Sequence, residues 1–379
     1  MIKTTVRLLF ACTFIYSADG IGSALLNDST IEEMVALKNE FTLPSLSVAI
    51  SLNNKVVFAQ AIGLSDVNST RMATTKTQYS VGSLAKPMTG LALAKLVDIK
   101  KIDLSRPVSK YVDNLKYAEA FSVEELAAHI AGIPHNTPER DIAEFKEVKD
   151  HASPRDAFYV FDKHPLLTNP GSEYHYSSNG YILLSAVIEN AAQQHYVDFL
   201  SEALWQPFGM NSTEHDTSFA GKENEATYYQ NYSDNQHFTE SIKKRDRSFL
   251  FGGGGFISTP TDLVNMARAT FDDSYLSKET QSRLSTPVAL RNGEINEDNY
   301  SLGWRVGQLK LGESDETLIT ALHHGGVTDK ASTAYLLVIP QCKAAIAFAT
   351  NYVPDQFWKM RGRMAKILIG YVNEDRCFK

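Results

Sequence analysis

Hydrophobic and polar positions alternate at both ends of the chain with the period of two that is typical of β-strands. Near the N-terminus, SLSVAISL and KVVFAQAIGL flank the pair Asn53-Asn54, a pattern that predicts two adjacent antiparallel strands joined by a tight turn. Near the C-terminus, three short apolar or alternating runs predict further strands: YSLGWRVGQLKL, STAYLLVIP and CKAAIAFATN. Strands at both ends of the chain predict one antiparallel sheet built from both termini.

Helical patterns flank and separate these strands. DSTIEEMVALKNEF predicts a helix capped by Asp28 or Ser29, and QFWKMRGRMAKILIGYV predicts an amphipathic helix that closes the chain. The segments between are mostly helical or irregular. We therefore expect an α/β (α+β) protein with a sheet domain, residues 25–85 and 295–379, flanked by helices. Residues 86–294 are expected to form a mostly helical insertion domain.

The composition is that of a globular protein long enough for two domains, with 379 residues, 43% hydrophobic and 21% charged. The formal net charge is −7, and the largest basic cluster is the short KKRDR from Lys243 to Arg247. These features argue against a nucleic-acid partner. The sequence does not indicate an oligomeric state.

The chain begins with a pattern typical of a signal peptide. In MIKTTVRLLFACTFIYSADG, Lys3 and Arg7 precede a short apolar run that small and polar residues follow. We expect residues 1–24 to form a leader, cleaved after Ala18 or Ala24, and the protein to be exported to a periplasmic or extracellular location. No later segment is long and apolar enough to predict a membrane span.

Removal of the leader would leave two cysteines, Cys342 and Cys377. In an oxidising compartment they can form a disulfide, and two free buried thiols are a nearly equal alternative. A bridge requires the C-terminal helix to pack on the sheet beside the turn that holds Cys342.

The first candidate for chemistry is the pair Ser83 and Lys86 in SLAKPMTGLALAKLV. If a helix starts near Ser83, the i, i+3 spacing places the lysine one turn away, where a desolvated amine with a lowered pKa can activate the serine hydroxyl. Pro87 supports a helix start here, because first-turn amides have no intrahelical partner to lose. The alternative is a serine N-cap. A second S-x-x-K, Ser241 and Lys244, lies in a polar stretch with no apolar helix behind it.

The second candidate is Tyr176 in NPGSEYHYSSNGYILL, where Ser177 and Ser178 are expected to cap a following helix. A tyrosine here could transfer protons if a cation such as Lys86 stabilised its phenolate. The alternative is a tyrosine-rich loop that packs its rings on the surface.

The third candidate is ALHHGGVTDKAS, in which His323 and His324 precede two glycines just before a predicted strand. Glycines allow backbone N–H groups to approach a ligand closely, so this edge could supply an oxyanion donor. A turn with incidental histidines is the alternative. Paired histidines could also bind zinc, but no H-E-x-x-H or zinc-type Cys/His spacing is present, so we expect no metal. The run Gly252–Gly255 lacks the G-K-[ST] of a phosphate loop, which favours close backbone packing.

The order of S-x-x-K, Tyr-Ser-x and His-x-Gly resembles the serine beta-lactamase and penicillin-binding protein superfamily, in particular its class C beta-lactamase-like branch with related esterases and peptidases. VEELAAHIAGIP, PFGMNST and GGGGFISTPTDL resemble further stretches of that family in the same order. The resemblance extends from about residue 30 to the C-terminus.

The resemblance implies that Ser83 is an acylated nucleophile and that Lys86 and Tyr176 transfer protons. It places His323 where beta-lactamases usually have the lysine of K-T-G. Gly325 and Gly326 then match the strand edge, with the Gly326 N–H joining that of Ser83 as oxyanion donors.

Two further positions implied in substrate binding depart from common members of the family. Ser178 stands where many have asparagine, and His324 stands where threonine or serine is frequent. With a histidine in place of a permanent cation at position 323, these changes favour an esterase or peptidase acting on a small molecule or peptide, without a cofactor. The alternatives are a D-alanyl-D-alanine carboxypeptidase, a class C-type beta-lactamase, and a non-catalytic cell-wall or ligand-binding protein of the same fold.

Overall fold

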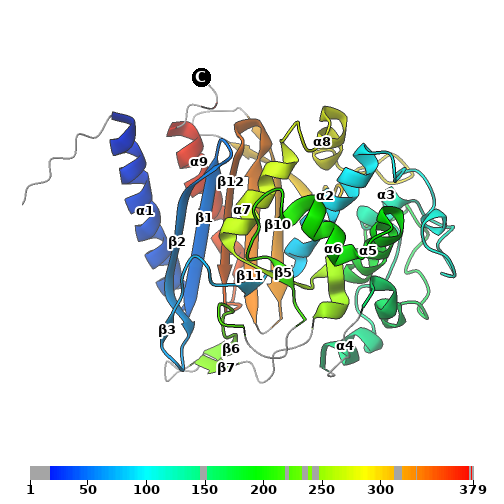
Figure 1. Cartoon of the computed structure of the whole chain (residues 1–379), viewed down its shortest axis with the longest axis horizontal. Coiled ribbons are helices and arrows are strands. Elements are labelled where there is room, and N and C mark those ends of the chain that lie inside the picture. Colours follow the sequence, from blue (N-terminus) through cyan, green and yellow to red (C-terminus); the bar gives the residue numbers. More distant parts are fainter. Residues whose placement is uncertain are drawn as a thin grey trace, which may run out of the picture.

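A seven-stranded antiparallel sheet joins the two ends of the chain, as the sequence predicts. The computed structural model describes residues 18–145, 152–217, 222–232, 238–240, 247–310, 318–329, 331–374 and 377. The strand order is β3-β2-β1-β12-β11-β10-β9 (Figure 1). The strands are β1 (Ser45–Leu52), β2 (Lys55–Asp66), β3 (Arg71–Met72), β9 (Arg305–Lys310), β10 (Leu318–Thr328), β11 (Ser332–Ile339) and β12 (Ala344–Thr350).

N-terminal and C-terminal strands meet in the middle of this sheet, where β1 pairs with β12 over Ser47↔Ala349 to Leu52↔Ala344. The predicted hairpin between β1 and β2 is confirmed. Asn53 and Asn54 both have positive φ, 48° and 66°, which a two-residue turn of the primed type requires and asparagine tolerates.

Two helices cover one face of the sheet, α1 (Ala18–Glu40) and α9 (Trp358–Glu374), and lie side by side in Figure 1. Their apolar residues form a core with the strands that includes Met34, Met364 and Leu368. The predicted cap at Asp28 or Ser29 is wrong, because α1 begins at Ala18. Most of the predicted leader lies outside the described residues.

The other face of the sheet meets the middle of the chain. The helix α7 (Pro260–Ala267), which the sequence assigns to the insertion, packs against β1 and β12. The remaining helices of this region are α2 (Ala85–Asp98), α3 (Val123–Ala127), α4 (Pro138–Phe145), α5 (Ser178–Ala192), α6 (Tyr196–Leu200) and α8 (Lys278–Leu284). One face of the sheet therefore shares a core with the insertion, and the other face forms a second core with α1 and α9.

Short elements connect these helices. They include the 3-10 helices η1 (Gly82–Leu84), η2 (Val108–Lys110), η3 (Pro154–Val160), η5 (Ser248–Gly253), η6 (Arg268–Thr270) and η7 (Pro340–Cys342), and the π-helical turn η4 (Ser201–Trp205). A three-stranded sheet has the order β4 (Tyr79–Ser80), β8 (Phe256–Ser258), β5 (Glu214–His215), and a two-stranded sheet pairs β6 (Tyr229–Tyr232) with β7 (Phe238–Glu240). No helix among the described residues is long and apolar enough to cross a membrane.

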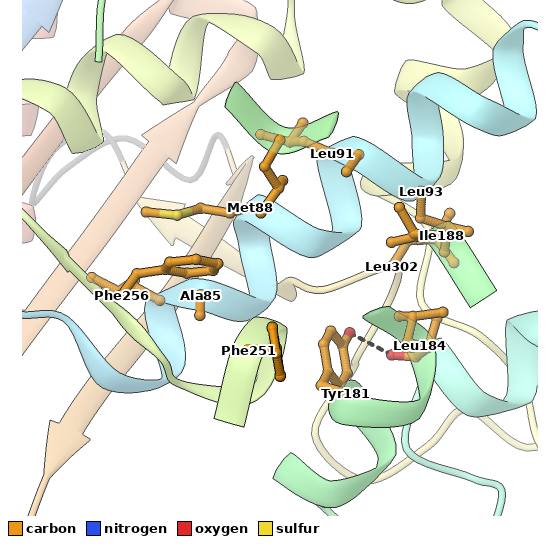
Figure 2. Packing of buried hydrophobic residues seen from close by; sticks show 14 of the residues in the cluster. Ala85, Met88, Leu91, Leu93, Tyr181, Leu184, Ile188, Phe251, Phe256 and Leu302 are labelled. Atoms are coloured by element: carbon orange, nitrogen blue, oxygen red, sulfur yellow. Dashed lines mark hydrogen bonds between the residues drawn. The ribbon is translucent and has the colours of Figure 1, made fainter. Parts of the chain in front are cut away.

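The buried packing between α2 and α5 holds the elements that carry the candidate site. Figure 2 shows Leu93 of α2 next to Ile188 of α5. The Tyr181 hydroxyl donates a hydrogen bond of 2.7 Å to the Ala127 carbonyl at the end of α3. These helices therefore form one packed unit with fixed relative positions.

The two cysteines are bonded to each other in the structure. Cys342 lies in η7 at the end of β11, and Cys377 follows α9, with their Cα atoms 5.5 Å apart. The bridge closes a segment with a sequence separation of 35 residues that contains β12 and α9.

We expect the Cys342→Ser, Cys377→Ser double variant to lose about 3 kcal/mol of unfolding free energy, because the bridge restricts the unfolded chain. Urea unfolding with and without reductant measures this. Reductant should destabilise the parent protein and leave the double variant unchanged. Alkylation of both cysteines in unreduced, denatured protein would show that the bridge is absent.

Candidate active site

Ser83 lies in η1, the 3-10 turn that leads directly into α2, so the predicted helix start is confirmed. The serine is not the cap of this helix, since no side-chain cap bond forms at the start of η1 or α2. Instead, Lys86 Nζ lies 3.1 Å from Ser83 Oγ. The structure thus brings together the pair that the S-x-x-K spacing predicts. The second S-x-x-K, Ser241 and Lys244, lies outside the described residues.

Lys86 is fully buried, with three oxygen partners and no carboxylate among the described residues. Besides Ser83, its Nζ donates 2.9 Å to Ser178 Oγ and 2.7 Å to the Gly253 carbonyl. Burial holds the pKa of Lys86 well below its ordinary value, and the nearby guanidinium groups of Arg140 and Arg305 lower it further. This lowered pKa favours the neutral amine, the form that a base for Ser83 requires.

Tyr176 lies in the loop before α5, with its ring 4.7 Å below Lys86 Nζ. Burial raises the pKa of Tyr176 to about 12, although a hydrogen bond with the Ser83 hydroxyl and the charge of Arg305 act in the opposite direction. The burial that lowers the pKa of Lys86 favours its neutral form, so the cation that would stabilise a Tyr176 phenolate is disfavoured here. Tyr176 is a phenol at neutral pH, and it can donate a proton.

Ser177 and Ser178 fix the start of α5. Ser177 is the N-cap, and its hydroxyl accepts a hydrogen bond from the Gly180 amide at 3.0 Å. Ser178 is the first helical residue, which turns its hydroxyl toward Lys86. The Ser178 amide donates 3.0 Å to His135 Nδ1, and the Ser177 amide donates 3.1 Å to His129 Nδ1. Two histidines thereby hold the segment that carries Tyr176.

The two-histidine, two-glycine segment lies inside strand β10 rather than before a strand. Because side chains alternate along a strand, neighbouring residues face opposite sides of the sheet. His324 pairs across β11 with Leu336, which belongs to the core shared with the insertion, whereas His323 pairs with Leu337, which belongs to the core under α9.

His323 is not brought to Ser83. Its ring lies 6.0 Å from the ring of Tyr335, on the side of the sheet that α9 covers. Gly325 faces the same side, since a Cβ at this position would lie 2.2 Å from Arg361 Nη2. The sequence pattern places His323 at the lysine position of K-T-G, whereas the structure has His324 on the side of Ser83. The match is thus displaced by one residue, and such a shift moves each side chain to the other face of the sheet.

His324 occupies the side that faces the candidate site. Its Nδ1 donates to the Gly325 carbonyl at 2.8 Å, so its Nε2 is an acceptor, 3.2 Å from Arg305 Nη1 and 3.0 Å from the Tyr300 hydroxyl. Burial holds the pKa of His324 well below its ordinary value, and the charge of Arg305 adds to this effect. His324 is therefore a neutral hydrogen-bonding group, and the permanent cation beside it is Arg305.

Strand β10 approaches Ser83 through its backbone. A Cβ on Gly326 would lie 1.8 Å from the Val81 carbonyl oxygen, so only glycine fits against η1. A Cβ on Gly82 would in turn lie 2.9 Å from the Val327 carbonyl oxygen. The Val327 carbonyl thus points from the strand toward η1. The Gly326 carbonyl instead accepts a hydrogen bond from the Thr333 hydroxyl of β11.

Sequence reasoning missed four residues around this site: His129, His135, Arg140 and Arg305. The Arg305 guanidinium lies 5.3 Å above the Tyr176 ring and pairs with Asp298 at 2.8 Å. Two histidines in the otherwise apolar AAHIAGIPH were a visible signal. Arg305 gave none, because a lone arginine in a strand pattern is usually solvated.

The run Gly252–Gly255 packs closely against the site, as the sequence predicts. A Cβ on Gly252 would lie 2.3 Å from Thr89 Oγ1, and one on Gly253 would lie 2.5 Å from the Ser178 carbonyl oxygen. The side chain of Lys86 is thus enclosed by backbone. Within the described ranges, no group of three or more His, Cys, Asp or Glu side chains is arranged to hold a metal ion.

A serine and a lysine at a helix start, a tyrosine beside them and an antiparallel sheet behind them are the arrangement of the beta-lactamase and transpeptidase fold. A family model described as Beta-lactamase matches residues 28–367, so the chain belongs to the beta-lactamase family. The superfamily and fold class predicted from the sequence are confirmed.

Individual relatives span most of the chain. "Serine beta-lactamase-like protein LACTB, mitochondrial" from Homo sapiens is 25% identical over 409 residues, which cover 83% of this chain and 72% of that protein. A class C beta-lactamase is similar with a TM-score of 0.70 at 19% identity, covering 93% of this chain and 96% of that one. The D-amino acid amidase from Ochrobactrum anthropi SV3, complexed with L-phenylalanine amide, reaches 0.72 at 20% identity, covering 95% and 100%. These structural likenesses show a shared fold.

Four histidines that are buried or partly buried should make stability fall in mild acid. Burial is the largest cause that lowers the pKa of each: His135 to about 3, His323 to about 4, and His129 and His324 well below their ordinary value. The unfolded chain binds protons near pH 6.5 while the folded protein does not. Each histidine thus adds stability that is fully present above pH 6.5 and is lost as the pH falls toward its folded pKa, at about 1.4 kcal/mol per pH unit.

Urea unfolding at pH 7 and pH 5 measures this effect. His135→Asn, which keeps an acceptor for the Ser178 amide, should lower the pH dependence by about one proton. The variant His195→Asn is the matched control, because the His195 side chain is 71% exposed. Equal pH dependence of the His135 variant and the parent would contradict the assignment.

Proposed function

We propose that this protein hydrolyses an amide or ester through an acyl-enzyme on Ser83. The observation that carries the proposal is the contact between the Ser83 hydroxyl and a fully buried Lys86 that has no carboxylate partner among the described residues. A serine hydroxyl becomes an effective nucleophile when an adjacent base takes its proton. A buried lysine with a lowered pKa supplies such a base at neutral pH.

The partners of Lys86 direct its lone pair. A neutral amine has two N–H groups, and the Gly253 carbonyl can only accept, so one N–H is committed to it. The Ser178 hydroxyl receives the second N–H. The lone pair is then left for the Ser83 hydroxyl, the third neighbour. Gly253 and Ser178 are therefore positioning groups for the base.

Tyr176 completes proton transfer. As Ser83 bonds to the substrate carbonyl, its proton passes to Lys86, and the bond to the leaving group breaks as the Tyr176 hydroxyl protonates that group. A proton then returns from the lysine ammonium to the Tyr176 phenolate, whose ring lies 4.7 Å from Nζ. Water releases the acyl group by the reverse sequence, so no cofactor takes part.

Two backbone amides are proposed to hold the oxyanion. Ser83 lies in the first turn of its helix, where amides lack an intrahelical partner. On β10, the carbonyl of Val327 faces η1. Because the N–H and C=O of one residue in an antiparallel strand point to the same side, the Val327 amide also faces η1. We therefore replace the Gly326 N–H, expected from the sequence, with the Val327 N–H. Gly326 keeps the strand close enough for this contact.

A second candidate function is that of a D-alanyl-D-alanine carboxypeptidase or class C-type beta-lactamase. Arg305 favours it, because its guanidinium supplies beside His324 the permanent positive charge that the sequence seemed to lack. A substrate carboxylate could be held there by charge-assisted hydrogen bonds. Asp298 already pairs with this arginine, which favours the broader assignment to amide or ester hydrolysis.

Intact mass after incubation with a fluorophosphonate tests the nucleophile. The parent protein should gain one phosphonyl group, and Ser83→Ala should gain none. Lys86→Met should label at least about 100-fold more slowly, because the base contributes that much to proton transfer. Lys95→Met is the matched control, since Lys95 lies on the same helix, donates to the Tyr275 carbonyl and should not affect labelling.

The same assay with a fluorescent penicillin separates the candidate functions. A phosphonate adduct without a penicillin adduct supports an esterase or peptidase. Both adducts on Ser83 support a penicillin-recognising enzyme. If the folded parent protein formed neither adduct, the result would contradict catalysis and favour a non-catalytic binding protein of the same fold.

A further inference from the structure

Behind the active-site strand, two polar side chains lack the partners that buried polar groups normally have. We call this group the rear cluster; it consists of His323, Gly325, Tyr335, Phe357 and Arg361. His323 and Gly325 come from β10, Tyr335 from β11, and Arg361 from the first turns of α9. The cluster lies on the face of the sheet opposite Ser83, because His323 and Gly325 alternate with the site-facing His324 and Gly326.

Arg361 carries a charge without a counterion. Its guanidinium lies 5.4 Å from the ring centres of both Tyr335 and Phe357, and one nitrogen rests against the Cα of Gly325. No described carboxylate pairs with Arg361, and none of its guanidinium nitrogens forms a hydrogen bond within the described residues. Burial lowers the pKa of Arg361, and no acidic residue offsets this effect. A largely buried charge without a partner is unfavourable, so the guanidinium is available to an anion.

His323 adds a second unpaired group. Its Nδ1 is buried and has no hydrogen-bond partner in the part of the chain that the structure describes. The ring lies 6.0 Å from Tyr335, whose other neighbour in the cluster is Arg361. Burial, with the charges of Arg305 and Arg361, keeps this imidazole neutral at physiological pH. A neutral imidazole can still donate one N–H, and the tautomer with the proton on Nδ1 has no acceptor for it among the described residues.

We propose that the rear cluster is a binding site for a carboxylate ligand, distinct from the candidate active site. Two aromatic rings lie against the guanidinium, which leaves its N–H edge for an anion. A carboxylate matches that edge, because two parallel N–H groups can bind its two oxygens. The aromatic rings favour a ligand with an apolar body next to the carboxylate.

Glycine at position 325 is what makes the site. A Cβ there would lie 2.2 Å from Arg361 Nη2 and 2.7 Å from its Cζ, so any side chain would displace the guanidinium. The sequence placed Gly325 at an oxyanion edge, but in the structure it faces α9. This role does not depend on the proposed acyl transfer at Ser83.

Benzoate tests the proposal, with neutral benzamide as a probe of the same shape. Titration of the full chain, followed by NMR of the histidine ring signals, should show benzoate binding and a shift of the His323 signal, and weak or no binding of benzamide. In Arg361→Gln the dissociation constant for benzoate should rise by at least about tenfold, because a charge-assisted hydrogen-bond pair is lost. A Ser83→Ala variant should bind benzoate as the parent does.

Arg363→Gln is the matched control. Arg363 lies two residues after Arg361 on α9 and pairs with Glu33 and Glu40. Its replacement therefore removes an arginine from the same helix without changing the rear cluster. Gly325→Ala should weaken benzoate binding while keeping both polar groups. Thermal unfolding of each variant shows whether it is folded. Unchanged benzoate affinity in folded Arg361→Gln, or equal affinity for benzamide, would overturn the proposal.

Discussion

The structure depends on one unfavourable burial: the amine of Lys86 lies in the protein interior with no described carboxylate beside it. Burying an ammonium without a counterion costs several kcal/mol, so the group loses its proton instead. Three oxygens, from Ser83, Ser178 and Gly253, surround the neutral amine and fix its direction. Burial without a counterion would only destabilise a protein if the lysine had a structural role. Here the same burial lowers the pKa of Lys86, which allows it to act as a base.

The fold supplies these three oxygens from distant parts of the chain. η1 carries Ser83 and the first turn of α2 carries Lys86, α5 begins at Ser178, and η5 ends at Gly253. The sheet closes the site from the other side, since Gly326 on β10 approaches Val81 more closely than any side chain would allow. Because β10 belongs to a sheet completed by N-terminal strands, the site requires both ends of the chain.

Much of this could be predicted from the sequence, and the failures have physical causes. Strand alternation and the Asn53-Asn54 turn predicted the sheet, and S-x-x-K predicted the contact of Ser83 with Lys86, because both are local patterns. Which side chains of a strand face the site is not a local property. A shift of one residue exchanges His323 for His324, and only the pairing of β10 with β11 decides which of them faces Ser83. The raised pKa of Tyr176 could not be read from the sequence, because the burial that governs it arises from tertiary packing. Arg305 was missed for the same reason.

The protonation state of Lys86 is the central claim, and carbon-13 NMR of the lysine Cε signals measures it directly. The Lys86 signal is assigned by its absence from the Lys86→Met spectrum. A neutral, buried base predicts that this signal titrates far below the ordinary lysine value of 10.5, with the amine deprotonated at neutral pH. A Lys86 signal that remains that of an ammonium up to about pH 10 would contradict the account.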